Sequence, residues 1–163
     1  MSEEEKEPFR ILFVCTGNTC RSPLAEALAR RALSERGWSH VEVSSAGVST
    51  LQGTPASDGA LRAALEEGLD LSEHRSALLT AERVEEADLV LGMTPSHVLS
   101  VDALGGEGKS ALLGAFAAGE EGGEGPDVPD PFGGDAKRYR ETVETLKRMV
   151  ERTLSRLEPV VAP

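Results

Sequence analysis

The sequence predicts a single α/β domain with a parallel sheet of four strands and helices on both faces. Short apolar runs, typical of buried strands, alternate along the chain with longer segments whose apolar residues recur at helical spacing. With 163 residues, the chain has about the length of one domain. Hydrophobic residues make up 39% and charged residues 28%, which is ordinary for a globular protein and excludes wholesale disorder.

The first part of the chain carries two predicted strands separated by a helix. Phe9–Cys15 is a short apolar run that stops at a Gly-Asn turn. Ser22 and Pro23 then predict a helix start, with serine as the N-cap and proline at the first helical position, and Gly37 ends that helix. Val41–Ser45 alternates apolar and polar residues and predicts the second strand.

The later part of the chain continues this alternation. A helix is expected over Gly59–Glu67, a buried strand over Ala87–Met93, a helix over Pro95–Ala103 and a fourth strand over Ser110–Phe116. Residues 119–134 are rich in Gly, Pro and Asp and predict a loop.

The predicted domain spans residues 9–158, between an acidic N-terminal tail at 1–8 and a C-terminal tail at 159–163. Asp135 caps its final helix, whose core-facing stripe consists of Tyr139, Val143, Leu146, Val150, Leu154 and Leu157. The first residues lack the basic and apolar regions of a signal peptide, and no apolar run approaches the ~18 residues that cross a bilayer. We therefore expect a cytoplasmic protein without membrane contact, and a monomer, the default for this size.

Charge and cysteine content narrow the function classes. Acidic residues number 28 against 17 basic ones, and the formal net charge of -11 repels phosphate backbones. Aromatic residues are only 4%, so base-stacking surfaces and nucleic acid partners are not expected. The two cysteines cannot form a secreted disulfide scaffold, and without histidines at ligand spacing they predict no metal site.

The segment Val14–Pro23, VCTGNTCRSP, is the most informative for chemistry. In a tight turn between a strand and a helix start, backbone N–H groups point inward and form an anion nest, and the helix N-terminus adds positive partial charge. Arg21 supplies a planar fork of donors for two phosphate oxygens. The turn that would form this phosphate-binding nest consists of Thr16, Gly17, Asn18, Thr19 and Cys20.

Two further residues complete the predicted chemistry. The helix N-terminus and the guanidinium favour the thiolate form of Cys15, which makes it a nucleophile aimed at phosphorus. Asp130 lies between two prolines that stiffen the late loop. Partly desolvated against Phe132, its carboxyl group is expected to protonate the leaving group and later to take a proton from water. Asp127 and Asp135 are weaker candidates for this role.

These motifs resemble those of the low-molecular-weight protein tyrosine phosphatases. The segment 14–23, the later DPFGGD at 130–135, Ser-Ala-Gly at 45–47 and Glu-His-Arg-Ser at 73–76 all match that family's pattern. The resemblance runs from Ile11 to about Leu157. It implies a small, twisted, four-stranded parallel sheet with helices on both faces, phosphorylated protein substrates, a phosphocysteine intermediate and no metal or other cofactor.

The resemblance also implies a role for each site residue. Cys15 becomes the nucleophile, Arg21 the phosphate clamp that stabilises transition-state charge, and Asp130 the general acid and then base. His40 and His97 have no such support and are interpreted as surface residues. The family's buried polar network, in which the asparagine holds the loop in a strained shape and the first serine also donates to the cysteine sulfur, corresponds to Asn18, Ser22, Ser45 and His74.

Three departures from the tyrosine phosphatase pattern resemble the protein arginine phosphatase branch instead. Thr19 stands where an apolar β-branched residue is usual, Phe132 is followed by two glycines rather than flanked by a second aromatic residue, and Met-Thr replaces Met-Asp at 93–94. Phosphoarginine presents a flat polar group whose N–H donors suit Thr19 and Asp130, while Phe132 stacks on one side. We expect phosphoarginine hydrolysis, with tyrosine phosphatase activity as the alternative.

Other function classes fit less well. An arsenate reductase on a similar fold relays electrons through further cysteines, which this chain lacks. A catalytically inactive anion-binding module predicts the loss of the nucleophile or the acid, yet both are present. A nucleotide-binding loop would need Gly-Lys-Ser/Thr after Gly17. Cys20 leaves two interpretations open: a small residue packed behind the loop, or a thiol that traps oxidised Cys15 as a disulfide.

Overall fold

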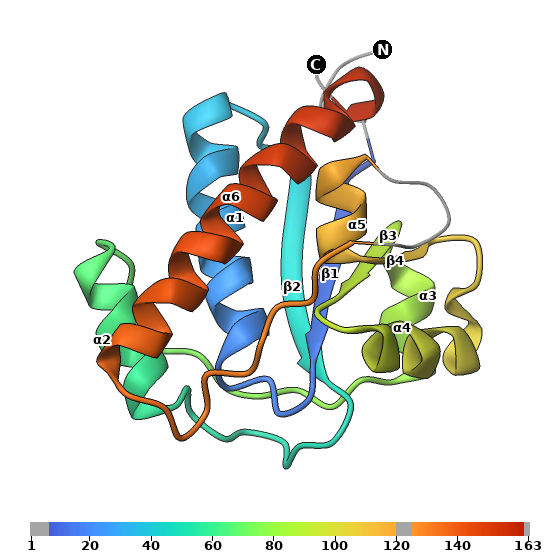
Figure 1. Cartoon of the computed structure of the whole chain (residues 1–163). Coiled ribbons are helices and arrows are strands. Elements are labelled where there is room, and N and C mark those ends of the chain that lie inside the picture. Colours follow the sequence, from blue (N-terminus) through green and yellow to red (C-terminus); the bar gives the residue numbers. More distant parts are fainter. Residues whose placement is uncertain (1–6, 120–124, 162–163) are drawn as a thin grey trace.

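Four parallel strands form one sheet in the order β2-β1-β3-β4 (Figure 1). The computed structural model describes residues 7–119 and 125–161. The strands are β1 (Phe9–Cys15), β2 (Val41–Gly47), β3 (Leu89–Gly92) and β4 (Ser110–Leu112). The predicted fold class, a four-stranded parallel sheet with helices on both faces, is confirmed.

Helices of different size cover the two faces of the sheet. The face with the larger hydrophobic core carries α1 (Arg21–Arg36), α5 (Leu113–Ala118) and α6 (Ala136–Val161), with α2 (Asp58–Glu66) packed beside α6. The other face carries α3 (Ala81–Glu86), α4 (Pro95–Val101) and a π-helical segment, Asp102–Gly106. Figure 1 shows α1 and α6 crossing one side of the sheet and α3 and α4 on the other.

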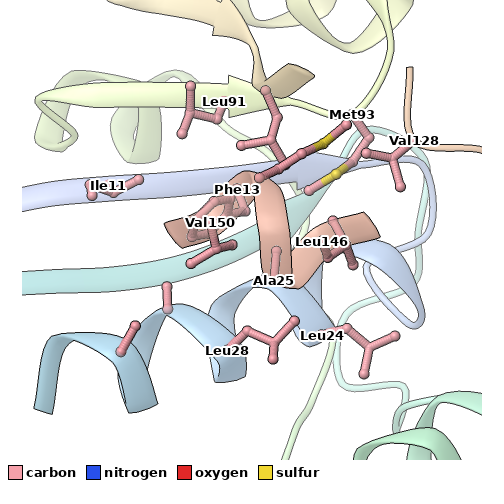
Figure 2. Packing of buried hydrophobic residues seen from close by; sticks show 14 of the residues in the cluster. Ile11, Phe13, Leu24, Ala25, Leu28, Leu91, Met93, Val128, Leu146 and Val150 are labelled. Carbon is pink, nitrogen blue, oxygen red and sulfur yellow. The ribbon is translucent and has the colours of Figure 1, made fainter. Parts of the chain in front are cut away.

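Strand β1 contributes to two hydrophobic cores because its side chains alternate between the faces. Ile11 and Phe13 point toward α1 and α6, while Leu12 and Val14 point toward α3 and α4, and all four are buried. A central parallel strand covered on both sides reads as an unbroken apolar run, as this one does. Figure 2 shows the larger core, in which side chains of β1 and β3 pack with Leu24, Leu28, Leu146 and Val150.

Two elements differ from the sequence prediction. The strand expected over Ser110–Phe116 ends at Leu112, and the chain turns into α5 at Leu113. Periodicity cannot distinguish a short buried helix from a short strand, and this segment packs as a helix against α6. Helix α3 was not predicted; the Thr80 hydroxyl caps it by accepting a hydrogen bond from the Arg83 N–H at 3.2 Å.

The final helix follows the prediction at its start and exceeds it at its end. The Asp135 carboxylate accepts a hydrogen bond from the Arg138 N–H at 3.0 Å, and the whole predicted apolar stripe is buried. Helix α6 continues through the buried Val161, so residues 159–161 are helical rather than part of a tail. Of the acidic tail expected at 1–8, residues 1–6 lie outside the described residues. Within the described ranges, no helix is long and apolar enough to cross a membrane.

The strand order determines where a ligand can bind. The chain leaves β1 to form β2 on one side and leaves β3 to form β4 on the other side, so these two connections diverge at the carboxyl ends of β1 and β3. In open parallel sheets, ligands bind in the crevice at this point. The late loop 125–135 crosses the same end, where the Val128 N–H donates to the Met93 carbonyl at 3.0 Å (Figure 1). Three loops therefore meet at one end of the sheet.

Candidate active site

The loop 16–20 curls tightly around the sulfur of Cys15. The Asn18 N–H donates a hydrogen bond to Cys15 Sγ at 3.3 Å, and Cys15 is buried. Asn18 has a φ of 55°, in the left-handed region that asparagine tolerates better than most residues. Gly47, opposite Cys15 in β2, allows the loop to approach: a Cβ there would lie 2.6 Å from the Thr16 carbonyl oxygen.

The Asn18 side chain is fully buried, and each of its hydrogen-bonding groups has a partner. Its Nδ2 donates to Ser22 Oγ at 2.8 Å and Ser45 Oγ at 2.9 Å, while its Oδ1 accepts from the Ala77 N–H at 2.8 Å. His74 Nε2 donates to the Asn18 carbonyl oxygen at 2.7 Å. The four residues assigned to the polar network therefore lie together, and they brace a backbone conformation that is otherwise unfavourable.

Ser22 faces the cysteine rather than capping the helix, so the N-cap prediction was wrong. Helix α1 begins at Arg21, and Cys20 occupies the N-cap position without a side-chain capping bond. Ser22 Oγ instead lies 2.9 Å from Cys15 Sγ. Because the Asn18 amide can only donate to this oxygen, the Ser22 hydrogen is free to point at the sulfur.

Arg21 is a buried cation with an unused donor. Its Nη1 donates to the Val128 carbonyl at 3.0 Å and its Nη2 to Thr16 Oγ1 at 3.4 Å, and Nη2 lies 3.7 Å from Asp130 Oδ2. Its Nε is buried without a hydrogen-bond partner among the described residues. Buried donors are rarely left unpaired, so this nitrogen indicates an acceptor, such as a phosphate oxygen, in the occupied site.

Asp130 lies at the edge of the site and is more exposed than expected. Its side chain is 52% exposed, and its Oδ1 accepts a hydrogen bond from the Phe132 N–H at 3.1 Å. Phe132 is 70% exposed and projects toward solvent. The expectation that Phe132 desolvates the Asp130 carboxylate is therefore wrong, because the loop places both side chains at an open rim.

A cavity of about 250 Å³ gathers most of the predicted site residues. Asn18 and Ser22 lie behind its wall, and Ser45 and His74 support them from further back. Donors surround a sulfur at its floor, and a carboxylate stands at its rim. The cavity is lined by Cys15, Thr16, Gly17, Thr19, Cys20, Arg21, Asp130 and Phe132.

Cys20 is held by polar neighbours behind the loop. Its sulfur lies 3.1 Å from Ser57 Oγ and 3.4 Å from the Tyr139 hydroxyl of α6. Burial, together with the hydrogen bond to Cys20, raises the pKa of Tyr139 to about 12, so the hydroxyl keeps its proton. Gly59 makes this contact possible, because a Cβ there would meet the Tyr139 ring at 2.2 Å.

His97 lies beside the site, and its interpretation as a surface residue was wrong. It is buried, and its Nε2 lies 2.9 Å from Thr16 Oγ1. Burial, and then the nearby Arg21 charge, lower its pKa to about 4. One signal was available: His97 follows β3, whose carboxyl end pairs beside that of β1. His40, in contrast, is half-buried and hydrogen-bonds the Val161 carbonyl at the far end of α6.

Comparison with known proteins supports the family resemblance seen in the sequence motifs. Residues 10–161 match the family described as low molecular weight phosphotyrosine protein phosphatase. The protein-arginine-phosphatase of Geobacillus stearothermophilus is 39% identical over 153 residues, which cover 93% of this chain and 97% of that protein. The low molecular weight protein-tyrosine-phosphatase Etp of Escherichia coli K12 is 37% identical over 144 residues, 87% of each chain.

A solved structure shares the fold closely. A cysteine-to-serine mutant of YwlE arginine phosphatase, with a phosphorylated active-site serine, superposes with a TM-score of 0.86 at 36% identity. The match covers 93% of this chain and 97% of that one. The strand order, the loop around Cys15 and the extent of these matches agree, and the chain belongs to the low molecular weight phosphotyrosine protein phosphatase family.

Proposed function

We propose that this phosphatase hydrolyses phosphoarginine on proteins through a phosphocysteine intermediate at Cys15, without a metal or other cofactor. The observation that carries the proposal is the cavity that a cysteine, an arginine and a carboxylate line together: Cys15, Arg21 and Asp130. The relative named protein-arginine-phosphatase supports the substrate class. We further propose that the protein works as a monomer in the cytoplasm.

In the first step, the Cys15 sulfur attacks phosphorus and the P–N bond to the guanidine nitrogen breaks. Arg21 and the N–H groups of the loop hold the three non-bridging oxygens, whose charge grows in the transition state. Asp130, in its protonated form, transfers its proton to the departing guanidine nitrogen. The arginine side chain leaves, and the phosphoryl group remains bonded to sulfur.

In the second step, water attacks the phosphocysteine. The Asp130 carboxylate takes a proton from that water, the P–S bond breaks, and inorganic phosphate leaves. The electron pair of that bond returns to the Cys15 sulfur. Ser22, 2.9 Å away, donates a hydrogen bond to the thiolate that forms. The enzyme is thereby restored to its starting state.

The rim of the cavity supports phosphoarginine over phosphotyrosine. Of the described residues that line it, Phe132 alone is aromatic, so a phenol ring would find an apolar wall on one side only. Thr19 adds a hydroxyl to the lining, and the half-exposed Asp130 offers a carboxyl oxygen that accepts from guanidinium N–H groups. Leaving such polar groups without partners penalises a substrate that lacks matching donors.

Steady-state rates on two peptides of identical sequence, one carrying phosphoarginine and one phosphotyrosine, test the preference. We expect the larger kcat/KM for phosphoarginine. Thr19→Ile removes the hydroxyl and should shift the ratio toward phosphotyrosine by about tenfold or more, whereas Thr19→Ser, which keeps the hydroxyl, should leave the preference on the arginine side. A wild-type preference for phosphotyrosine would overturn the proposal and favour a tyrosine phosphatase, the class named by the relative from Escherichia coli.

A further inference from the structure

We propose that His97 is a positioning residue that turns the Thr16 hydroxyl into a hydrogen-bond donor for a phosphoryl oxygen of the substrate. This inference rests on the phosphatase chemistry of the proposed function, but not on the choice between phosphoarginine and phosphotyrosine. It is carried by two hydrogen bonds to His97 and two to Thr16, which together fix the direction of each proton.

The surroundings of His97 determine its tautomer. The Thr94 N–H lies 3.1 Å from His97 Nδ1, and a backbone N–H can only donate, so Nδ1 is the unprotonated acceptor. The Thr94 hydroxyl lies 3.2 Å from the same nitrogen. Burial and the Arg21 charge keep the ring neutral by lowering its pKa to about 4. The single ring proton is therefore on Nε2, the nitrogen that faces Thr16.

Both acceptor positions of Thr16 Oγ1 are consequently occupied. It accepts one hydrogen bond from His97 Nε2 at 2.9 Å and another from Arg21 Nη2 at 3.4 Å, and both of these nitrogens can only donate. A hydroxyl has two lone pairs and one hydrogen, so only the hydrogen remains. No described residue accepts it, and Thr16 lines the cavity above the Cys15 sulfur.

The chemistry of the substrate indicates what this hydrogen meets. Phosphoryl oxygens are acceptors, whereas the guanidinium N–H groups of phosphoarginine are donors and would repel the hydroxyl hydrogen. The Thr16 hydroxyl therefore suits an oxygen of the phosphoryl group and adds a side-chain donor to the backbone nest. His97 does not touch that oxygen; it sets the direction of Thr16 from behind.

The two ring nitrogens of His97 have different tasks, and two substitutions separate them. In His97→Asn, the side-chain oxygen can replace Nδ1 as the acceptor for the Thr94 N–H, but the side chain is too short to reach Thr16. In His97→Gln, the amide nitrogen can replace Nε2 as the donor to Thr16, but the acceptor for Thr94 is lost. A purely structural role predicts that His97→Asn is the milder change, whereas the positioning role predicts the opposite for activity.

Inhibition by orthovanadate and the kinetics with p-nitrophenyl phosphate provide the test. We expect Thr16→Val and His97→Asn each to weaken vanadate inhibition and lower kcat/KM by about tenfold, the usual size of a hydrogen bond to a charged group. His97→Gln should recover most of that loss, even if its melting temperature is lower than that of His97→Asn. In the Thr16→Val background, His97→Asn should have little further effect.

Two results would overturn the inference. One is full additivity of Thr16→Val and His97→Asn, which would mean that His97 acts through another group. The other is a His97→Asn enzyme with normal vanadate inhibition and a normal kcat/KM. Neither measurement uses a phosphopeptide, so a failed preference for phosphoarginine would leave this test intact, and failure here would leave that preference intact.

Discussion

Ser22 Oγ lies 2.9 Å from the Cys15 sulfur and accepts a hydrogen bond from the Asn18 amide, which leaves the Ser22 hydrogen free to point at the sulfur. This arrangement stabilises negative charge on sulfur both before attack and when the thiolate leaves the phosphoenzyme. A thiolate can only accept, so Ser22 is the donor whenever Cys15 is deprotonated. The Ser45 hydroxyl also accepts from Asn18, and it donates to Glu26 Oε1 at 2.6 Å because a carboxylate oxygen can only accept.

Ser22→Ala removes the donor to the departing thiolate and should lower kcat by about 10²-fold, with a smaller effect on KM. Because the second step suffers most, phosphoenzyme should accumulate, and acid quenching followed by mass measurement would detect it. Ser39→Ala, at an exposed serine, is the matched control and should behave as the wild type. A Ser22→Ala enzyme with unchanged kcat would show that the sulfur does not need this donor.

Gly47→Ala should disable the loop by steric contact with backbone. The new Cβ would lie 2.6 Å from the Thr16 carbonyl oxygen and 2.9 Å from the Asn18 nitrogen, neither of which can rotate away. We expect kcat/KM to fall by at least about 10²-fold, because displacing the loop misaligns its donors. Gly37→Ala is the control: at a φ of 74° it should cost about 1 kcal/mol of stability, with no effect on kcat/KM. Normal activity in Gly47→Ala would contradict the tight fit.

An element or a site residue can be predicted from the sequence when the contacts that determine it lie close together along the chain. Strand β1 is predicted to the residue because burial on both faces makes it a continuous apolar run. The fourth strand is predicted too long, because an apolar run such as Leu112–Phe116 is compatible with either backbone. Cys15 and Arg21 could be paired from their local spacing, since one turn and one helix start separate them.

The remaining site residues depend on contacts between distant segments. The hydrogen bond between His97 and Thr16 joins residues 81 positions apart, and no local pattern marks it. His74 reaches the Asn18 carbonyl over 56 positions, and only the family resemblance identified it in advance. The exposure of Asp130 depends on the path of a loop without regular structure, and the prediction that Phe132 desolvates its carboxylate was wrong. Site residues that are close together along the chain can be predicted from the sequence, whereas the partners of buried polar groups can be identified only once the fold is known.

His97 should make the protein less stable in mild acid. Burial, and then Arg21, lower its pKa from the usual 6.5 to about 4, while Asp130 and Asp127 oppose the shift. The unfolded chain therefore binds a proton near pH 6.5 that the folded protein accepts only near pH 4, and stability falls as the pH is lowered between these values. The full effect is about 3 kcal/mol. Urea unfolding at pH 7.5 and 4.5 should show that the free energy of unfolding falls less in His97→Asn than in the wild type. Equal losses would show that His97 is not the source of the acid sensitivity.

Asp130→Asn should slow the reaction most when the leaving group needs a proton. A poor leaving group such as a peptide guanidine should lose about 10²–10⁴-fold in kcat/KM, and p-nitrophenol, which leaves as an anion, much less. Asp127→Asn, at an exposed neighbour in the same loop, is the control and should change both substrates equally little. Equal losses on the two substrates in Asp130→Asn would remove the general-acid role and leave only a binding role at the rim.

Cys20 should protect Cys15 from irreversible oxidation. The two are the only cysteines in the chain, and both line the same cavity on one curled loop. Peroxide oxidises a reactive thiolate to sulfenic acid, and a neighbouring thiol displaces water from it to form a disulfide. We expect peroxide to inactivate the wild type with a mass loss of two hydrogens, reversed by dithiothreitol, and Cys20→Ser to lose activity irreversibly.

Because Ser57 and Tyr139 hold the Cys20 sulfur from behind, Tyr139→Phe, which releases one contact, should speed disulfide formation. Oxidised wild type without a Cys15–Cys20 bridge would leave Cys20 as a packing residue.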